Sequence, residues 1–575
     1  MQNNIISFIG ALLILLSPVY LFRISHHASL VGHWILLACI YLLIIDRKLF
    51  KKISWFLLII ISSLIHLYFT FIIIIFYFIF LLNKFYQSKR VILNDFLFSL
   101  ITIFSLWVTM YVVGYFEIRY FDGIAGGYGE YKLNLLSAFD PGSNFNRWSF
   151  ILPDIKLTTL EQSEGFNYFG LGSLIIILIS IIIFIINKSK FIYLKKNFVF
   201  IIASIFFTVI ALSNKVSFGN IEILNIELNK YIYAGLSIFR ASGRFFWPVY
   251  YLILIFSLVF LYKNISKKKY IILILSCLLI QIIDISGAIK NYSKIINKVT
   301  ISENEDLNNL FQMNKYLISA SNSNYNTNFS KLSYLTEKFK IKKTNVINLA
   351  RVNRKVLAET RYGIYKNFYN KKIETNTIYL IESFSHLRNL QSIFKDDLYF
   401  YKIDNIWLMT NIKEELKVQK KLQFVNFKKI NFNYNYKFNN DLKDNFLGLG
   451  WSYNNIKSGI WSDGYISSLL FNIDIIDKDL VFEINCEPYL NSKHTNQDLE
   501  IYYNNFLVKK INFEFGKKNN NLIKFELKKE LITNNNIELR FKFKNPGSPS
   551  DYRESPDSKK LGILLKNILV KEKII

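Results

Sequence analysis

Long apolar runs fill the first half of the chain, and this feature constrains its fold more than any other. Between Ile5 and about Ser286, runs rich in Ile, Leu and Phe alternate with short polar stretches. After Gly287 no apolar run reaches the about 17 to 25 residues that a helix needs to cross a bilayer. Because 575 residues exceed what one core usually supports, we expect a membrane unit over residues 1–286 and separate units after it.

The apolar runs predict about nine transmembrane helices. They are placed at residues 5–22, 30–45, 53–65, 69–82, 91–113, 170–186, 198–213, 246–262 and 270–286. The third and fourth are short and could form one long helix. Polar residues between them, Ser62, Ser63 and His66, favour a reversal near 66–68 instead.

Basic clusters occupy every second connection between these helices. They are Arg47, Lys48, Lys51 and Lys52, then Lys84, Lys89 and Arg90, then Lys188, Lys190, Lys195 and Lys196, and finally Lys263, Lys267, Lys268 and Lys269. Because Lys and Arg collect in cytoplasmic loops, the N-terminus is predicted to lie on the cytoplasmic side of the membrane. The loops 23–29, 114–169 and 214–245 and the region after 287 then lie outside, in periplasmic or extracellular space.

The formal charge of +28 at first suggests a nucleic-acid partner. Anchoring of the membrane spans accounts for many of the lysines, and the others are scattered among Asn and Ile. We therefore expect membrane lipids as partners and no nucleic acid.

The outer loop 114–169 is rich in aromatic and glycine residues, which argues against disorder. Tyr128, Tyr131 and Trp148 are candidates for stacking on sugar rings, although an interfacial position explains any single ring equally well. Asp140 and Glu164 are candidate catalytic groups, because a transfer reaction needs a carboxylate that accepts a proton or holds a metal ion. For each carboxylate taken alone, a solvated loop position is the stronger interpretation.

Arginines and histidines mark the other outer segments. Arg240 and Arg244 in FRASGRFFWP would share one face if that stretch were helical, where they could bind a phosphate or extend to the membrane interface. Arg23, His26 and His27 open the first outer loop, and His66 caps the next. The histidines could ligate a metal ion or move a proton, although structural hydrogen bonding is the stronger interpretation for each.

Four segments carry a family resemblance: SPVYLFRISHHASLVGHW, GYGEYKLNLLSAFDP, SEGFNYFGLG and FRASGRFFWP. In this order they resemble an uncharacterised bacterial branch of the GT-C membrane glycosyltransferases, over most of residues 10–286. The resemblance implies a protein of the bacterial inner (plasma) membrane, with a polyprenyl-phosphate sugar donor and a glycan acceptor at the cell surface. It also implies that Arg240 and Arg244 meet the lipid phosphate and that the loop 114–169 covers the acceptor cleft.

One departure from the family pattern bears on activity. GT-C enzymes generally carry a catalytic acidic residue in their first outer loop, whereas residues 23–29 contain no Asp or Glu. The segment around His26 resembles a later part of the family's membrane unit. The expectation is therefore a chain that lacks the first spans, either completed by an upstream-encoded fragment or a split or inactive form. The metal site is unknown, with Mg²⁺ or Mn²⁺ as the candidate cofactor.

The second half predicts two soluble units outside the cytoplasm. Residues 287–432 read as a small α/β unit, with strands near 344–349, 376–383 and 398–410 and helices near 304–318, 352–367 and 385–395. Residues 433–575 alternate as an antiparallel β-sandwich that resembles accessory domains of surface-glycan enzymes. Trp451 and Trp461 are its candidate glycan-binding rings, with core packing as the alternative.

Two functions follow from these features. The first is an inverting transfer of a sugar from a polyprenyl-phosphate donor to a surface glycan or lipid at the outer membrane face. The alternative is a non-catalytic, membrane-anchored protein that binds or assembles a polysaccharide.

Overall fold

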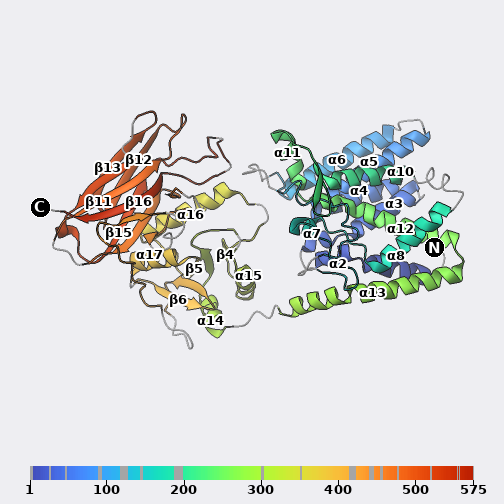
Figure 1. Cartoon of the computed structure of the whole chain (residues 1–575), viewed down its shortest axis with the longest axis horizontal. Coiled ribbons are helices and arrows are strands. Elements are labelled where there is room, and N and C mark those ends of the chain that lie inside the picture. The colour runs from blue at the N-terminus through green and yellow to red at the C-terminus, as the bar shows by residue number, and fades with distance from the viewer. Residues whose placement is uncertain are drawn as a thin grey trace. The chain divides into compact units, whose positions relative to one another are not determined.

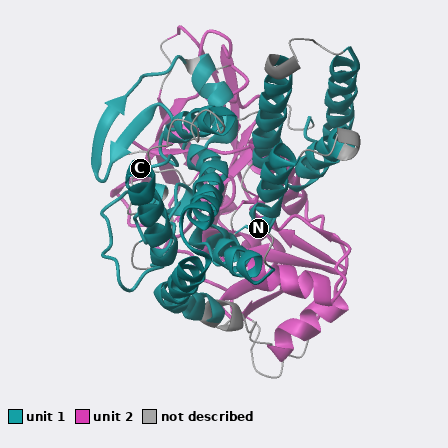
Figure 2. Ribbon diagram, turned by 90° about the vertical axis from the view of Figure 1, so that its right-hand side faces the viewer, with its two compact units in different colours: residues 1–119, 124–300 teal, residues 120–123, 301–575 magenta. Residues whose placement is uncertain are grey.

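The computed structural model of the protein contains two compact units (Figure 2). The first comprises residues 1–119 and 124–300, and the second residues 120–123 and 301–575. The described residues are 4–24, 27–45, 48–88, 93–116, 127–142, 147–186, 198–298, 304–324, 326–349, 352–395, 397–413, 422–438, 446–452, 458–474, 478–517, 521–552, 554–555 and 557–573.

The first unit is helical, with one small hairpin (Figure 1). Its longer helices are α1 (Asn4–Leu15), α3 (Trp34–Ile44), α4 (Lys48–Ile65), α5 (Leu67–Ser88), α6 (Leu93–Val112), α8 (Leu171–Ile186), α10 (Phe198–Leu212), α12 (Trp247–Asn264) and α13 (Lys267–Lys298). Its shorter elements are α2 (Pro18–Ile24), η1 (Ala28–Val31), α7 (Thr159–Glu164), β1 (Lys215–Phe218), β2 (Ile221–Asn225), α11 (Lys230–Leu236), η2 (Ser237–Phe239) and η3 (Ser242–Phe246).

Four helices in the described part of the chain are long and apolar enough to cross a membrane. They are Leu67–Phe85, Leu93–Val112, Ser242–Asn264 and Lys267–Ser293. The pair α1 and α2, bent by 57°, makes a fifth if it counts as one span. The predicted nine spans are not supported, although each predicted segment contains a helix. Three of those helices are only 10–17 residues long, and α4 opens with three lysines.

Helices α4 and α5 form the predicted reversal. The indole of Trp55 lies 5.6 Å from the ring of Tyr77 and 5.8 Å from that of Phe80, so the two helices run side by side in opposite directions. His66 separates them, and its Nδ1 accepts the backbone N–H of Tyr68 at 3.2 Å. This histidine therefore caps a turn.

One lysine from each of two basic clusters lies at the same end of the helical unit. Lys52 at the start of α4 and Lys84 near the end of α5 both form ion pairs with Asp95 on α6. Tyr68, at the opposite end of α5, is about 24 Å away from Lys84 along the helix axis at 1.5 Å per residue. The two ends of α5 are thus chemically distinct.

The second unit begins with a five-stranded sheet of order β4-β3-β5-β7-β6. Strands β3 (Tyr316–Ser319), β4 (Lys343–Thr344) and β5 (Thr377–Ile381) are parallel, whereas β6 (Tyr399–Ile403) and β7 (Ile406–Thr410) form an antiparallel hairpin that joins through β7. The accompanying helices are α14 (Glu305–Met313), α15 (Phe329–Lys338), α16 (Arg354–Tyr369) and α17 (Phe384–Phe394).

Two antiparallel sheets complete the second unit. One has the order β10-β15-β12-β13 and the other β14-β11-β16-β8, with β9 also pairing β16. Their strands are β8 (Asn435–Lys437), β9 (Ile460–Trp461), β10 (Ile466–Asn472), β11 (Leu480–Pro488), β12 (Asn496–Tyr503), β13 (Phe506–Glu514), β14 (Leu522–Leu527), β15 (Asn536–Phe543) and β16 (Ile563–Glu572), with a 3₁₀ turn η4 (Lys529–Leu531). Buried Leu, Ile and Phe side chains from both sheets share one core, as the alternating pattern predicts.

Candidate functional site

In the first unit, the carboxylate of Glu164 is shared by Arg23 and Arg244, and together with His27 these residues form a polar cluster. Oε2 of Glu164 accepts Nη1 of Arg23 at 3.0 Å, and Nε and Nη2 of Arg244 at 2.9 and 2.7 Å. Nε2 of His27 lies 3.6 Å from the other carboxylate oxygen. Sequence analysis singled out all four residues, and the fold brings them together from three separate segments.

Local packing explains why Glu164 and Arg244 meet. Glu164 ends α7, and Gly165 follows so tightly that a Cβ there would lie 2.0 Å from the carbonyl oxygen of Lys132. A Cβ on Gly243 would lie 2.7 Å from the Cα of Gly165. The amide of Asn167 donates to the carbonyl oxygens of both glycines. Two glycines thus let the backbone before Arg244 press against the end of α7.

Helix α7 is itself anchored at its start. Thr158 and Glu161 form a capping box, in which each side chain binds the other residue's backbone N–H. Glu161 also lies 3.5 Å from the ammonium of Lys132 and accepts the amide of Asn134. Glu161 is therefore a structural residue that fixes the helix carrying Glu164.

Aromatic rings flank both guanidinium groups. Arg23 lies 5.3 Å from the Trp247 ring, and Arg244 lies 4.7 Å from the Tyr68 ring. The Arg23 side chain is only 1% exposed, whereas that of His27 is 49% exposed. The cluster is therefore closed beneath Arg23 and open at His27.

The cluster holds Glu164 ionised. Burial acts to raise the pKa of the Glu164 carboxyl, but the nearby His27 and the charges of Arg23 and Arg244 outweigh it and hold the pKa well below its usual range. A carboxylate with so low a pKa is a weak base. Two arginines around one carboxylate leave an excess of positive charge, which suits an anionic ligand.

Arg240 is placed apart from this cluster. The stretch around it is two 3₁₀ helices, η2 and η3, with Arg240 and Ala241 between them, so the condition of a shared helical face is not met. The guanidinium of Arg240 lies 5.5 Å from the ring of Tyr131. Tyr68, which sequence analysis overlooked, accepts the Ala241 N–H at 2.8 Å and so fixes the turn between the two arginines.

Asp140 is buried in the outer loop. Its Oδ1 accepts the backbone N–H groups of Gly142 and Ile155, and its Oδ2 accepts the amide of Gln162. Burial raises the pKa of Asp140 to about 6 despite these hydrogen bonds. At 2% exposure it organises the loop and offers no open carboxylate.

The aromatic candidates are mostly packing residues. Trp148 is 1% exposed beside Phe166, and Tyr128 is 8% exposed beside Tyr233. His26 lies outside the described residues. In the sandwich, Trp451 is buried and its indole N–H donates to the Ser468 carbonyl, so its ring has no face open to a glycan.

Trp461, the second expected glycan-binding ring, is half-buried. It lies edge-on to Tyr489 at 5.9 Å. Core packing, the alternative that the sequence left open, thus describes Trp451 fully and Trp461 in part.

Sequence analysis overlooked a buried carboxylate on α13. Asp284 accepts the hydroxyls of Ser149 and Tyr168 and the backbone N–H of Leu171. It therefore ties the end of the outer loop and the start of α8 to α13. A lone carboxylate within an apolar run was the available signal.

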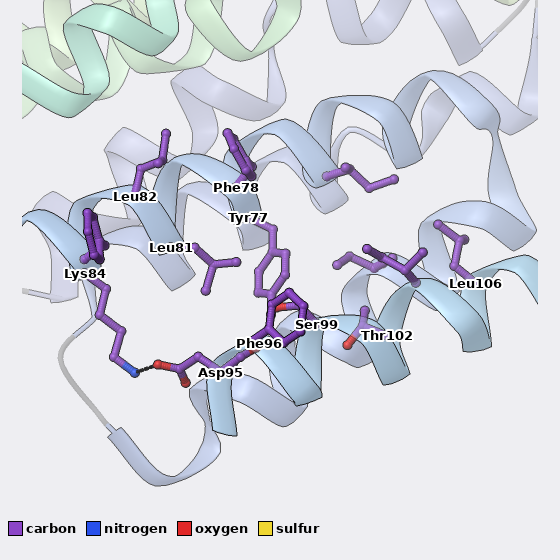
Figure 3. Close-up of a pocket in the computed structure, with 14 residues that line it drawn as sticks. Tyr77, Phe78, Leu81, Leu82, Lys84, Asp95, Phe96, Ser99, Thr102 and Leu106 are labelled. Carbon is purple, nitrogen blue, oxygen red and sulfur yellow. Dashed lines mark hydrogen bonds and ion pairs between the residues drawn. The ribbon is translucent and has the colours of Figure 1, made fainter. Parts of the chain in front are cut away.

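An apolar cavity of about 360 Å³ lies among α4, α5 and α6 (Figure 3). Its lining is hydrophobic apart from Tyr77, Ser99, Thr102 and the ion pair of Lys84 with Asp95. It is at the lysine-rich end of α5, away from Glu164. Among the described residues, no group of three or more His, Cys, Asp or Glu side chains could hold a metal ion.

The first unit thus combines helices long and apolar enough to cross a membrane with a polar cluster that suits an anionic ligand. Its residues 1–286, just under half of the chain, match a family described as a domain of unknown function (DUF6311). No curated protein matches the chain.

Two solved structures give weak similarity to part of the chain. CsCBM6-3 from Clostridium stercorarium, in complex with cellobiose, is 11% identical, with 26% of this chain and 100% of that chain covered and a TM-score of 0.17. The cycloalternan-forming enzyme from Listeria monocytogenes, in complex with a pentasaccharide, is 14% identical, with 34% and 18% covered and a TM-score of 0.15. Scores this low carry no argument about fold or function.

Proposed function

We propose that the protein is a membrane glycosyltransferase that uses a polyprenyl-phosphate sugar at the outer membrane face. The observation that carries the proposal is the joining of Glu164, Arg23, Arg244 and His27 in one cluster. An arginine-rich site compensates the charge of a lipid-phosphate leaving group, which is where negative charge develops during transfer.

Each residue then has a distinct role. Arg244 meets the donor phosphate, while the enclosed Arg23 acts as a positioning residue because its side chain is 1% exposed. Glu164 holds both arginines in place. The acceptor hydroxyl oxygen attacks the anomeric carbon, the bond from that carbon to the phosphate oxygen breaks, and the half-exposed His27 takes the hydroxyl proton.

The sidedness of the site supports an outer-face reaction. Arg244 lies over Tyr68 at the start of α5, whereas Lys52 and Lys84 meet Asp95 at the other end. If the lysine-rich end is cytoplasmic, as basic residues favour, the cluster faces outward.

A transfer assay tests the proposal. The full chain is reconstituted in proteoliposomes, with and without the protein encoded immediately upstream, and supplied with labelled polyprenyl-phosphate hexoses and pentoses. Transfer that is lost in Arg244→Ala and retained in the exposed-site control Glu130→Gln supports the proposal. Absence of transfer from every donor in both preparations would refute it.

The alternative, a non-catalytic polysaccharide-binding protein, is favoured by one observation. Neither candidate carboxylate is an available base, since Glu164 is tied to two arginines and Asp140 is enclosed. Binding of a donor lipid without turnover in the same proteoliposomes would select this alternative.

A further inference from the structure

A groove of about 730 Å³ lies within the second unit, between helix α16 and the sheet β10-β15-β12-β13. A groove of this size accommodates several sugar rings or a comparable ligand. It is separate from the Glu164 cluster and shares no residue with the expected Trp451 and Trp461 platform.

Basic residues line the floor of the groove because strand residues alternate between two faces. Along β15 and just beyond it, Phe541 and Phe543 point into the sandwich core, so Arg540, Lys542 and Lys544 lie on the opposite face. On the adjacent strand β12, Tyr502 is paired with Arg540. The floor therefore presents cations beside an aromatic ring.

Helix α16 forms the wall of the groove and is fixed to the sandwich. Asp463 accepts the hydroxyl of Tyr362 at 2.6 Å and forms an ion pair with Arg361 at 2.8 Å. The Tyr369 hydroxyl, further along the helix, donates to Asn389 and lies 3.0 Å from Ser468 Oγ. These contacts preform the groove, which lowers the ordering cost of binding.

Arg540 is held in place within this framework. Its Nη2 donates to Glu538 and its Nη1 to Asn505, each at 3.0 Å, and its guanidinium lies 5.2 Å from the ring of Tyr369. The groove thus combines a fixed guanidinium with the exposed lysines Lys366 and Lys542.

We propose that this groove binds an acidic polysaccharide segment. Its lining carries four cations, Arg540, Lys366, Lys542 and Lys544, against two carboxylates, Glu359 and Asp463. Arg361 neutralises Asp463, and Glu538 and Glu500 likewise offset Arg540 and Lys544, so the positive surplus rests on Lys366 and Lys542 against Glu359. A surplus of positive charge selects an anionic ligand. The exposed Tyr465 and the half-buried Tyr502 supply ring faces on which sugars stack, which favours an acidic glycan over a simple anion.

The inference does not depend on the proposed transfer reaction. It predicts binding by the second unit whether the first unit is a transferase or an anchor. Binding measurements therefore separate its failure from the failure of the proposed function.

Binding of defined oligosaccharides to the full chain in nanodiscs tests the proposal. The probes are hexagalacturonate and hyaluronan hexasaccharide, with methyl-esterified hexagalacturonate as the uncharged match, measured by isothermal titration calorimetry. We expect an acidic hexasaccharide to bind, with affinity falling as salt is raised, and the methyl ester to bind at least about tenfold more weakly.

Substitutions locate the site. Lys542→Gln and Tyr465→Ala should each weaken binding about five- to tenfold. Their matched controls, Lys437→Gln on the other sheet and the exposed Tyr434→Ala, should leave it within about twofold. Unchanged thermal unfolding of all four variants excludes misfolding as the cause.

Four results would each overturn the proposal. They are no binding of either acidic hexasaccharide, equal binding of the methyl ester, equal loss in the control variants, and equally tight binding of oligo(dT), which would indicate a general polyanion surface.

Discussion

Nη2 of Arg244 lies 2.7 Å from Oε2 of Glu164, although 80 positions separate the two residues in the chain. The same oxygen accepts Arg23 at 3.0 Å, so one carboxylate oxygen holds two guanidinium groups together. Removing Glu164 would leave two neighbouring cations without their shared counter-charge. This cluster therefore links the stability of the fold to the candidate chemistry.

Glu164→Gln should lower the free energy of unfolding at neutral pH and make this free energy less dependent on pH in the acidic range. The folded-state pKa of Glu164 is held below its ordinary 4.5, so its stabilisation is complete above about pH 4.5 and is lost as the pH falls toward the folded pKa. We expect a loss of about 3 kcal/mol at pH 7, because a largely buried ion pair loses one partner. Thermal unfolding in detergent from pH 3.5 to 7.5 measures both effects.

The exposed Glu130 provides the control. Glu130→Gln should follow the unsubstituted protein at every pH. A Glu164→Gln protein with an unchanged melting temperature at pH 7 would show that the ion pairs contribute no net stability.

Arg244→Lys should weaken donor use while the protein still folds. A lysine keeps the charge but loses the planar group that binds Glu164 through Nε and Nη2 and presents further donors to a phosphate. We expect the KM for the lipid donor to rise about tenfold, with little change in the KM for the acceptor. Proteoliposome transfer assays at varied donor concentration measure this difference.

Arg240→Lys is the matched comparison for Arg244→Lys. Its guanidinium lies over the ring of Tyr131, where a lysine can also bind, so its donor KM should change less than about twofold. A tenfold rise in this variant too would instead support a phosphate clamp made by both arginines. Full activity of Arg244→Lys would remove Arg244 from the donor site.

The sequence predicted the positions of the helices better than the number of membrane spans. Apolar runs locate helices, because a helix of any length needs an apolar face to pack. Whether an apolar helix of 10–17 residues crosses a membrane depends on how it packs against its neighbours. The sequences of α3, α8 and α10 alone do not show this packing. The residues of the Glu164 cluster were named singly as candidates, whereas their assembly depends on the close approach of Gly165 and Gly243, which the sequence does not reveal.

The β6–β7 hairpin shows a second feature that the sequence-based prediction missed. Residues 398–410 were predicted as one strand, but β6 and β7 are separated by Asp404 and Asn405, whose φ angles are 49° and 61°. Asp and Asn adopt this left-handed conformation more readily than most residues, and a two-residue turn of this kind reverses a strand. The long alternating pattern on both sides concealed the turn.

Asp284→Asn should loosen the outer loop. Asp284 accepts three hydrogen bonds, including Tyr168 at 2.8 Å and Leu171 N–H at 2.9 Å, and an amide provides only one accepting oxygen. We expect a loss of about 2 kcal/mol and faster tryptic cleavage after the exposed Lys156. Cleavage after Lys156 at the unsubstituted rate would show that Asp284 does not anchor the loop.

Asp140→Asn should have the opposite effect on stability. Burial raises the folded-state pKa of Asp140 to about 6, above its ordinary 3.8, so ionising it destabilises the fold as the pH rises from about 3.8 through 6. The asparagine variant should therefore be more stable at pH 7.5 by about 1 kcal/mol, after loss of the Gln162 hydrogen bond is included. The gain should shrink as the pH falls through 6 and reverse near pH 4, where only the loss of the Gln162 hydrogen bond remains. A destabilised variant at pH 7.5 would contradict the assignment.

The two ends of α5 predict the orientation of the protein in the membrane. Lys84 and Lys52 meet Asp95 at one end, and Tyr68 contacts Arg244 at the other. Because basic residues are retained on the cytoplasmic side, a reporter fused after Lys269 should be cytoplasmic. Helix α13 runs from Lys267 to Lys298, so a reporter fused after Asn304 should lie across the membrane. Paired alkaline phosphatase and green fluorescent protein fusions measure both positions. Phosphatase activity after Lys269 and fluorescence after Asn304 would place the Glu164 cluster on the cytoplasmic side and exclude an outer-face transfer.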